Sequence, residues 1–242
     1  MTYDSYLELQ KRYSRMISND YMLPADLMRR FAGGVMTIYA DDQALFLFEK
    51  REGFTKLHFR LVDKSAFLAP QGETVAAFLT YRNDRRPSTA ADWLLEQGFT
   101  RTKTLRRHTA AAITGALSLD GVEHMPPNEA YAMLSEYFSA VEADMPCREL
   151  FEGALCVRSQ NGTPAGVLYM GQTLVVAVAP EARGQGIGRK LYRAYAAVKA
   201  QAGKKPVFHE WISPDNAASL SMFKSLGFTP DNVMTDCYVL LC

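Results

Sequence analysis

The chain has 242 residues, of which 48% are hydrophobic and 22% charged, and its formal net charge is +1. This composition argues against disordered and fibrous classes, and the small net charge indicates neither a nucleic acid nor a membrane as a partner. The four cysteines have no CxxC spacing, so no metal site is predicted, and free thiols are expected in a reducing, cytoplasmic compartment.

The N-terminal half begins with an apolar pattern at helical spacing, which predicts an amphipathic helix over residues 3–18. Pro24 suits the first turn of a second helix, predicted near 25–32. The strands expected next cover residues 35–39, 44–49, 56–62 and 74–81.

A short helix closed by Gly98 follows, and it leads into a strand with a basic cluster. The cluster consists of Arg101, Lys103, Arg106, Arg107 and His108. We interpret it as a charged edge strand, because such charges discourage edge-to-edge aggregation. A site for an acidic partner is the alternative.

The C-terminal half is predicted to open with a strand at 117–122 and a helix capped by Asn128. Asn161-Gly162 is a hairpin turn sequence between two strands. The remaining predicted elements are strands 155–159, 165–170, 173–178 and 207–212, helices 187–202 and 216–226, and a strand pair over 228–241 that turns at 231–232.

Residues 176–191 run from an apolar strand through a glycine-rich turn into an amphipathic helix. Glycines at alternate positions let a ligand approach main-chain N–H groups, and a helix N-terminus adds unpaired N–H groups that suit a phosphate. A tight connection without a ligand is the alternative. A P-loop is set aside because Arg189 and Lys190 follow Gly188, and the G-x-G-x-G spacing is not a dinucleotide fingerprint.

The pattern Arg183-x-x-Gly186-x-Gly188 resembles the coenzyme A loop of the GNAT N-acetyltransferase superfamily. The segment from Asn216 to Phe228 resembles the later helix of that family, which begins at Asn and ends in Gly-Phe. The resemblance covers about residues 117–242. It implies an α/β fold (an α+β mixed sheet) of the GNAT-like acyl-CoA N-acyltransferase type, with a sheet that opens between the strand ending at Val178 and strand 207–212.

The same resemblance implies an acetyl-CoA-dependent N-acetyltransferase, with acetyl-CoA as co-substrate and no metal. The pantetheine arm would pair with main-chain groups near Val176 and Val178, and the glycine loop would hold the pyrophosphate. The implied cofactor-binding residues are Val176, Ala177, Val178, Arg183, Gly184, Gln185, Gly186, Ile187, Gly188, Arg189 and Asn216.

Two positions depart from the family pattern. Phe223 stands where a tyrosine often serves as acid for the leaving thiol, and residues 172–175 lack the glutamate that often serves as base. The nearest catalytic candidates are His209 and Glu210, which strand alternation places on opposite faces. His209 has a suitable intrinsic pKa, and Glu210 would be costly to bury unpaired; a structural role is the alternative for each.

Two Gly-Phe-Thr triplets, at 98–100 and 227–229, each follow a short predicted helix. They favour two domains, with residues 1–116 as a degenerate GNAT-like or accessory domain and residues 117–242 as the acetyl-CoA-binding domain. Coincidence is the alternative to a tandem duplication. The segment between strands 56–62 and 74–81 is too short for a glycine loop and long helix, so one coenzyme site is expected.

The sequence leaves three functions open. The first is acetyl transfer to a primary amine of a small-molecule or peptide acceptor. The second is a coenzyme A-binding sensor or interaction module that performs no chemistry, and the third is an enzyme that uses another acyl or aminoacyl donor. The acceptor and the oligomeric state, a homodimer included, are not determined.

Overall fold

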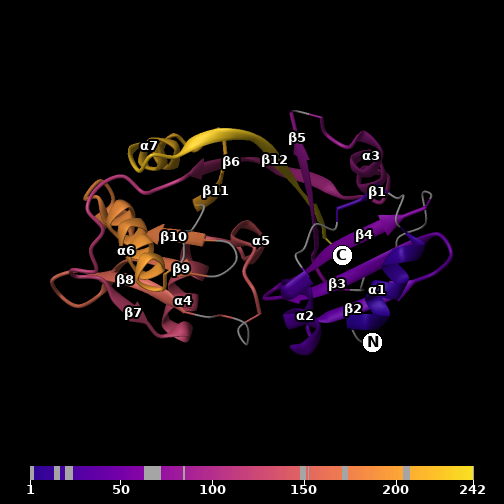
Figure 1. The fold of residues 1–242 in the computed structure, drawn as a ribbon, viewed down its shortest axis with the longest axis horizontal. Helices are drawn as coiled ribbons and strands as arrows, with labels where there is room; N and C mark the ends of the chain where they lie inside the picture. Colours follow the sequence, from indigo (N-terminus) through magenta and orange to yellow (C-terminus); the bar gives the residue numbers. More distant parts are fainter. Residues whose placement is uncertain are drawn as a thin grey trace. The chain divides into compact units, whose positions relative to one another are not determined.

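The computed structural model describes residues 3–13, 17–19, 24–62, 72–83, 85–147, 151, 153–170, 174–203 and 208–241. The chain forms two compact units, whose elements are labelled in Figure 1. The first unit comprises Met1–Thr104, Met145–Cys147 and Val233–Cys242, and the second comprises Leu105–Asp144 and Arg148–Asn232. This division differs from the predicted one at residue 117, because each unit contains a segment from the other half of the sequence.

The first unit contains three helices and a mixed sheet within its described residues. The helices are α1 (Tyr3–Arg12), α2 (Pro24–Ala32) and α3 (Ser88–Glu96). The strands are β1 (Ile17–Ser18), β2 (Met36–Ala40), β3 (Ala44–Arg51), β4 (Phe54–Leu61), β5 (Val75–Arg82), the start of β6 (Thr100–Ala110) and most of β12 (Thr229–Leu240). They lie in the order β6-β12-β5-β4-β3-β2, with β1 paired to β4.

The core of this unit forms where α3 covers the sheet. Trp93 is fully buried, and its ring lies 4.7 Å from that of Phe59 and 6.0 Å from that of Phe46. Strand alternation brings both phenylalanines to the same side of β3 and β4 as the helix, because they are directly paired. Aromatic burial therefore fixes α3 on this sheet.

The second unit contains a four-stranded antiparallel sheet in the order β10-β9-β8-β7. The strands of this sheet are β7 (Glu123–Met125), β8 (Ala154–Arg158), β9 (Pro164–Met170) and β10 (Leu174–Val178). The second unit also contains β11 (Phe208–Ile212), which is not part of this sheet. Its helices are α4 (Pro127–Tyr137), α5 (Ala140–Ala143), α6 (Ile187–Gln201) and α7 (Ala217–Ser225), and a 3-10 turn covers Pro180–Ala182. Strand β11 pairs with β6 and not with β10. The two strands that were predicted to separate, β10 and β11, therefore belong to different sheets.

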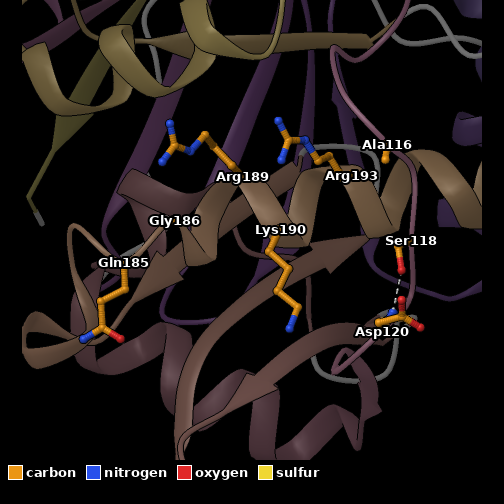
Figure 2. Close-up of a pocket in the computed structure, with 8 residues that line it drawn as sticks. All are labelled: Ala116, Ser118, Asp120, Gln185, Gly186, Arg189, Lys190 and Arg193. Carbon is orange, nitrogen blue, oxygen red and sulfur yellow. Dashed lines mark hydrogen bonds between the residues drawn. The ribbon is translucent and has the colours of Figure 1, made fainter.

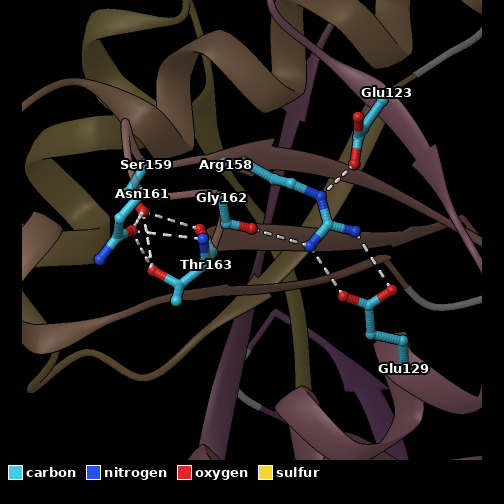
Figure 3. Close-up of polar contacts among 7 residues, drawn as sticks. All are labelled: Glu123, Glu129, Arg158, Ser159, Asn161, Gly162 and Thr163. Atoms are coloured by element: carbon cyan, nitrogen blue, oxygen red, sulfur yellow. Dashed lines mark hydrogen bonds and ion pairs between the residues drawn. The ribbon is translucent and has the colours of Figure 1, made fainter.

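The hairpin predicted at Asn161-Gly162 joins β8 and β9, as Figure 3 shows. Gly162 has a φ of +84°, and the Asn161 side chain accepts a hydrogen bond from the Thr163 hydroxyl at 2.8 Å. Beside the turn, the Arg158 guanidinium forms ion pairs with Glu123 and Glu129. These ion pairs join Arg158 of β8 to Glu123 of β7 and to Glu129 of α4, so they connect α4 to the sheet.

Two predictions from local sequence are wrong. The first helix ends at Arg12, and Ile17 and Ser18 instead form strand β1, because their main chain pairs with Arg60 and Leu61 of β4. Residues 117–122 lie in turns and irregular chain, and the strand begins only at Glu123.

The basic cluster does not lie on an edge strand. The first part of β6 lies beside β12 in the first unit, and its second part pairs with β11 in the second unit. The predicted strand pair over 228–241 is also wrong, because β12 is one continuous strand. Asp231 does not turn the chain, because Arg107 holds its carboxylate at 2.6 Å.

Each half of the sequence therefore supplies a strand to the unit built mainly from the other half. Val233–Leu240 pairs antiparallel with β5, and Arg106–Ala110 pairs antiparallel with β11. This exchange explains why the units do not separate at residue 117.

A buried carboxylate holds β12 in the first unit. Asp236 has 0% exposure and accepts hydrogen bonds from the hydroxyls of Thr104 at 2.6 Å and Tyr81 at 3.3 Å. Its other oxygen lies 2.5 Å from Arg86 Nε and 3.9 Å from Arg101 Nη1. These contacts come from the two strands β5 and β6 and from the segment after β5.

We expect Asp236→Asn to lower the free energy of unfolding by about 2–3 kcal/mol, because it removes the buried charge that faces Arg86 and Arg101. Urea denaturation measures this loss. As a matched control, Asp231→Asn breaks a more exposed pair with Arg107 and should cost at most about 1 kcal/mol. Equal costs for the two variants would contradict the assignment.

Candidate functional site

The turn between β10 and α6 has a backbone that only glycine adopts readily. Gly184 and Gly186 have φ angles of +77° and +80°, in the left-handed region. Gly186 is the N-cap residue of α6, and no side chain within the described chain caps this helix. The N–H groups of the first helical turn have no intrahelical acceptor and are therefore available to an anion.

The third glycine of the motif has a different role. A Cβ on Gly188 would lie 2.5 Å from the Met222 sulfur, so this glycine permits the close packing of α6 on α7. Its neighbour Ile187 is buried in the hydrophobic core. Ile187 and Gly188 were both predicted to bind the cofactor, and at these two residues only the main chain is accessible to a ligand.

Strand β10 is the end strand of its sheet. The N–H and C=O groups of its successive residues point alternately toward β9 and toward the other side of the strand. The N–H of Ala179 donates to Ala165 of the preceding strand at 3.0 Å, so Ala177 also faces β9. The intervening residues Val176 and Val178 therefore direct their N–H and C=O groups to the other, open edge. This arrangement agrees with the predicted pantetheine contact at Val176 and Val178, but the main chain of Ala177 is already used by β9.

The polar side chains predicted around the cofactor lie on both sides of the glycine turn. Arg183 Nε donates to the Val178 carbonyl at 3.3 Å, and Gln185 Nε2 donates to the Glu181 carbonyl at 3.1 Å. Asn216 caps α7 by accepting a hydrogen bond from the Ser219 N–H at 3.0 Å. That last contact is the structural function of an N-cap residue.

Figure 2 shows a pocket of about 650 Å³ beside the glycine turn. Arg189, Lys190 and Arg193 line it from α6, with Arg189 and Arg193 directed to one side of the helix and Lys190 to the other, and Ser118 and Asp120 line it from residues 116–120. The remaining lining residues are Ala116, Gln185 and Gly186. Three cations and one carboxylate make this pocket positively charged. Sequence reasoning missed Ser118, Asp120 and Arg193, because no motif connects residues 116–120 with α6.

In the first unit, β4 lies between β3 and β5, and both of its sides are covered by described segments of the chain. Strands β4 and β5 pair in parallel only over Thr55–Leu57 and Val75–Ala77. Beyond that point, Asn19 covers β4: its N–H donates to the Phe59 carbonyl at 3.2 Å, and its side-chain oxygen accepts from the Phe59 N–H at 2.7 Å. The chain itself therefore occupies this edge.

The two catalytic candidates have opposite environments. On β11, His209 is exposed and Glu210 is 5% exposed, as alternation predicts. Glu210 lies on the face covered by α6, where Phe208 and Ile212 belong to the hydrophobic core. Only His209 is open to water.

Burial raises the pKa of Glu210 well above its usual range. The nearby Tyr192 hydroxyl opposes this shift, yet neither that hydroxyl nor Glu210 Oε1 forms a hydrogen bond within the described residues. Burial also raises the pKa of Tyr192. Burial therefore disfavours the charged form of Glu210.

Phe223 leaves no hydroxyl at the position of the expected tyrosine. It is 4% exposed, and its ring packs edge-on against Tyr192 at 4.9 Å and Phe228 at 5.1 Å. The side chain therefore belongs to the core between α6 and α7.

An open strand edge, a glycine turn and the uncapped start of α6 lie next to one another in this α/β domain. Residues 128–228 match the model of the acetyltransferase (GNAT) family. One curated relative, the mycothiol acetyltransferase of Renibacterium salmoninarum, is 34% identical over 68 residues. That match spans 28% of this chain and 20% of the relative.

Solved structures show the same fold over nearly the whole chain. A GNAT acetyltransferase from Novosphingobium aromaticivorans matches with a TM-score of 0.59 and 15% identity, over 87% of this chain and 93% of that one. A tandem GNAT protein from the clavulanic acid biosynthesis pathway matches with a TM-score of 0.58 and 11% identity, over 99% and 94%. The predicted GNAT-like fold is thus confirmed, and one similar structure is a tandem protein.

Glu210→Gln should make stability less dependent on pH. The folded protein keeps a proton on Glu210 that the unfolded chain releases above about pH 4.5, so wild-type stability falls as pH rises through this window. As the pH is raised from 5 to 8, the variant should gain stability relative to wild type, by at most about 1.4 kcal/mol per pH unit and only while the pH stays below the raised pKa of Glu210. Thermal unfolding across this range measures it. Glu136→Gln, an exposed control, should show a constant difference.

Proposed function

We propose that the protein is an N-acetyltransferase that moves the acetyl group of acetyl-CoA to a primary amine. The single observation that carries this proposal is the open edge of β10, which leads directly into the glycine turn and the uncapped start of α6. A linear ligand with a hydrogen-bonding arm and a pyrophosphate fits these two features in sequence.

The residues would hold such a ligand chiefly through the main chain. Val176 and Val178 would pair with its amide groups, and the first-turn N–H groups after Gly186 would bind its pyrophosphate. Acetyl-CoA, when bound, supplies an activated acetyl thioester. The N–H of Val176 is positioned to donate to an oxyanion that forms beside the strand.

The attacking amine must lose a proton to a base or to water. His209 is the exposed candidate on β11, while burial raises the pKa of Glu210. Phe223 offers no acid for the leaving sulfur, but a thiol with a pKa near 8.5 leaves as a thiolate without one. A catalytic role for His209 or Glu210 stays a prediction.

A coenzyme A-binding module without chemistry is the second candidate. The burial of Glu210 and the packed ring of Phe223 favour it. Acetyl-CoA titration followed by assay of thiol release across a panel of amines separates the two. Acceptor-dependent release supports the transferase, whereas binding without release across the panel supports the module.

The acceptor is proposed only as a class. The curated relative is a mycothiol acetyltransferase, which favours a small-molecule amine over a peptide. Competition between acyl-CoAs would identify a donor other than acetyl-CoA. No described helix is long and apolar enough to cross a membrane. The cytoplasmic location and the homodimer remain predictions.

Gly186→Glu should weaken acetyl-CoA binding at least a hundredfold, because it places a carboxylate at the site of the pyrophosphate and a side chain at a φ of +80°. Gly203→Glu is the matched control: Gly203 follows the same helix at its other end, has a φ of +66° and has open space around it. Isothermal titration should show one binding site per chain in the control. Equal affinities in the two variants would contradict the proposed site.

A further inference from the structure

The carboxylate of Asp236 lies on the face of the first unit's sheet that α3 covers. Asp236 pairs with Leu79, and both Leu79 and Tyr238 belong to the hydrophobic core beneath that helix. Alternation along β12 places Asp236 and Tyr238 on the same face. Because the Asp236 side chain is fully buried, its negative charge must be balanced by groups close to it.

Two arginines face this carboxylate from neighbouring segments of the unit. Arg86 follows β5, and its Nε lies 2.5 Å from Asp236 Oδ2. Arg101 lies on β6, and its Nη1 is 3.9 Å from the same oxygen, which is too far for a hydrogen bond. The Arg86 guanidinium also lies over the Tyr81 ring, 5.8 Å from its centre, and the Tyr81 hydroxyl donates to Asp236. The aspartate and the tyrosine together fix the position of Arg86.

One carboxylate balances only one of these two cations. Arg86 is the nearer partner of Asp236, and within the described residues Arg101 has no ion pair with any other carboxylate. The three side chains therefore carry one positive charge in excess. Two guanidiniums beside a single oxygen also repel each other, and an anion bound between them would relieve this repulsion.

Both guanidiniums are open to solvent as well as to the buried carboxylate. The side chains of Arg86 and Arg101 are 39% and 44% exposed. A guanidinium has five N–H donors, and one carboxylate engages at most two of them. Each arginine thus keeps donors for a further acceptor. Since the contact with Asp236 already restricts these side chains, an anion that binds them costs less conformational entropy than it would at two freely moving arginines.

The size of the excess charge indicates which anion fits. A monoanionic carboxylate would neutralise it and could accept N–H groups from both guanidiniums. A phosphate dianion would add a second negative charge beside the buried carboxylate of Asp236, and these like charges would repel each other. The arrangement therefore favours a carboxylate over a phosphate.

We propose that Arg86 and Arg101 form a site in the first unit for the carboxylate of a small organic acid, with Asp236 as the residue that positions both guanidiniums. The acidic partner considered for the basic cluster is thereby assigned to Arg101, together with Arg86, which lies outside that cluster. All three residues belong to the first unit, so the site depends neither on acetyl-CoA nor on the proposed function.

The test titrates butyrate into the full chain without coenzyme A, at constant ionic strength, and follows the NMR shifts of the Arg86 amide and its neighbours. Wild type should bind butyrate saturably and at least tenfold more tightly than butyramide, which has a similar shape without the charge. Arg101→Gln should weaken butyrate binding at least tenfold. Arg101→Lys keeps the charge but loses the planar set of donors, so its affinity should fall between the two.

Arg12→Gln is the matched control, because it removes the same charge from the same unit. Arg12 ends α1, which packs with Leu45 and Leu47, whereas α3 packs with Phe46 on the other face of β3. Butyrate should therefore bind this variant as tightly as it binds wild type. Thermal unfolding checks that Arg12→Gln and the two Arg101 variants are folded.

Three results would overturn the site. The first is the absence of saturable binding by wild type, and the second is equal affinity of wild type and Arg101→Gln. The third is equal weakening by Arg12→Gln, which would show a response to overall charge. Tighter binding of butyl phosphate than of butyrate would overturn the choice of a carboxylate. Because no acetyl-CoA is present, each of these results leaves the proposed acetyl transfer untouched.

Discussion

The need to satisfy every main-chain N–H and C=O group governs both units. In the second unit, β10 ends its sheet and directs the polar groups of Val176 and Val178 toward an open edge. In the first unit, β1 and Asn19 pair with the part of β4 that β5 leaves unpaired. An unpaired strand side can pair with another segment or with a ligand. Within the described residues, one side of β10 is unpaired, whereas β4 is covered by β1 and Asn19.

The exchanged strands explain the position of residues 111–122, here called the linker, which connect β6 to β7. Strand β6 continues into the second unit and pairs with β11, so the chain must return from Ala110 to β7 across the outer face of α6. Hydrogen bonds from Arg193 and to Leu226 fix that path. The pocket beside α6 thus follows from topology, because residues 116–120 line it only when the linker takes this route.

Burial decides the chemistry available on β11. The neighbouring residues His209 and Glu210 differ in environment because one faces water and the other faces α6. Burial raises the pKa of Glu210 and also that of Tyr192 beside it. Phe223 packs on that same tyrosine, so this side of the domain is a stable apolar core with two buried polar atoms rather than an acid–base centre.

The sequence by itself determined the features that arise from neighbouring residues. Helical periodicity gave α6, Asn161-Gly162 gave the hairpin, and the glycine pattern gave the turn, since each depends on local backbone preference. The tertiary structure alone decided that Ile17 and Ser18 form a strand, that β6 is interior and that β12 is unbroken. It also decided the pocket, because pairing partners and charge clusters are set by residues distant in sequence, which no local pattern records.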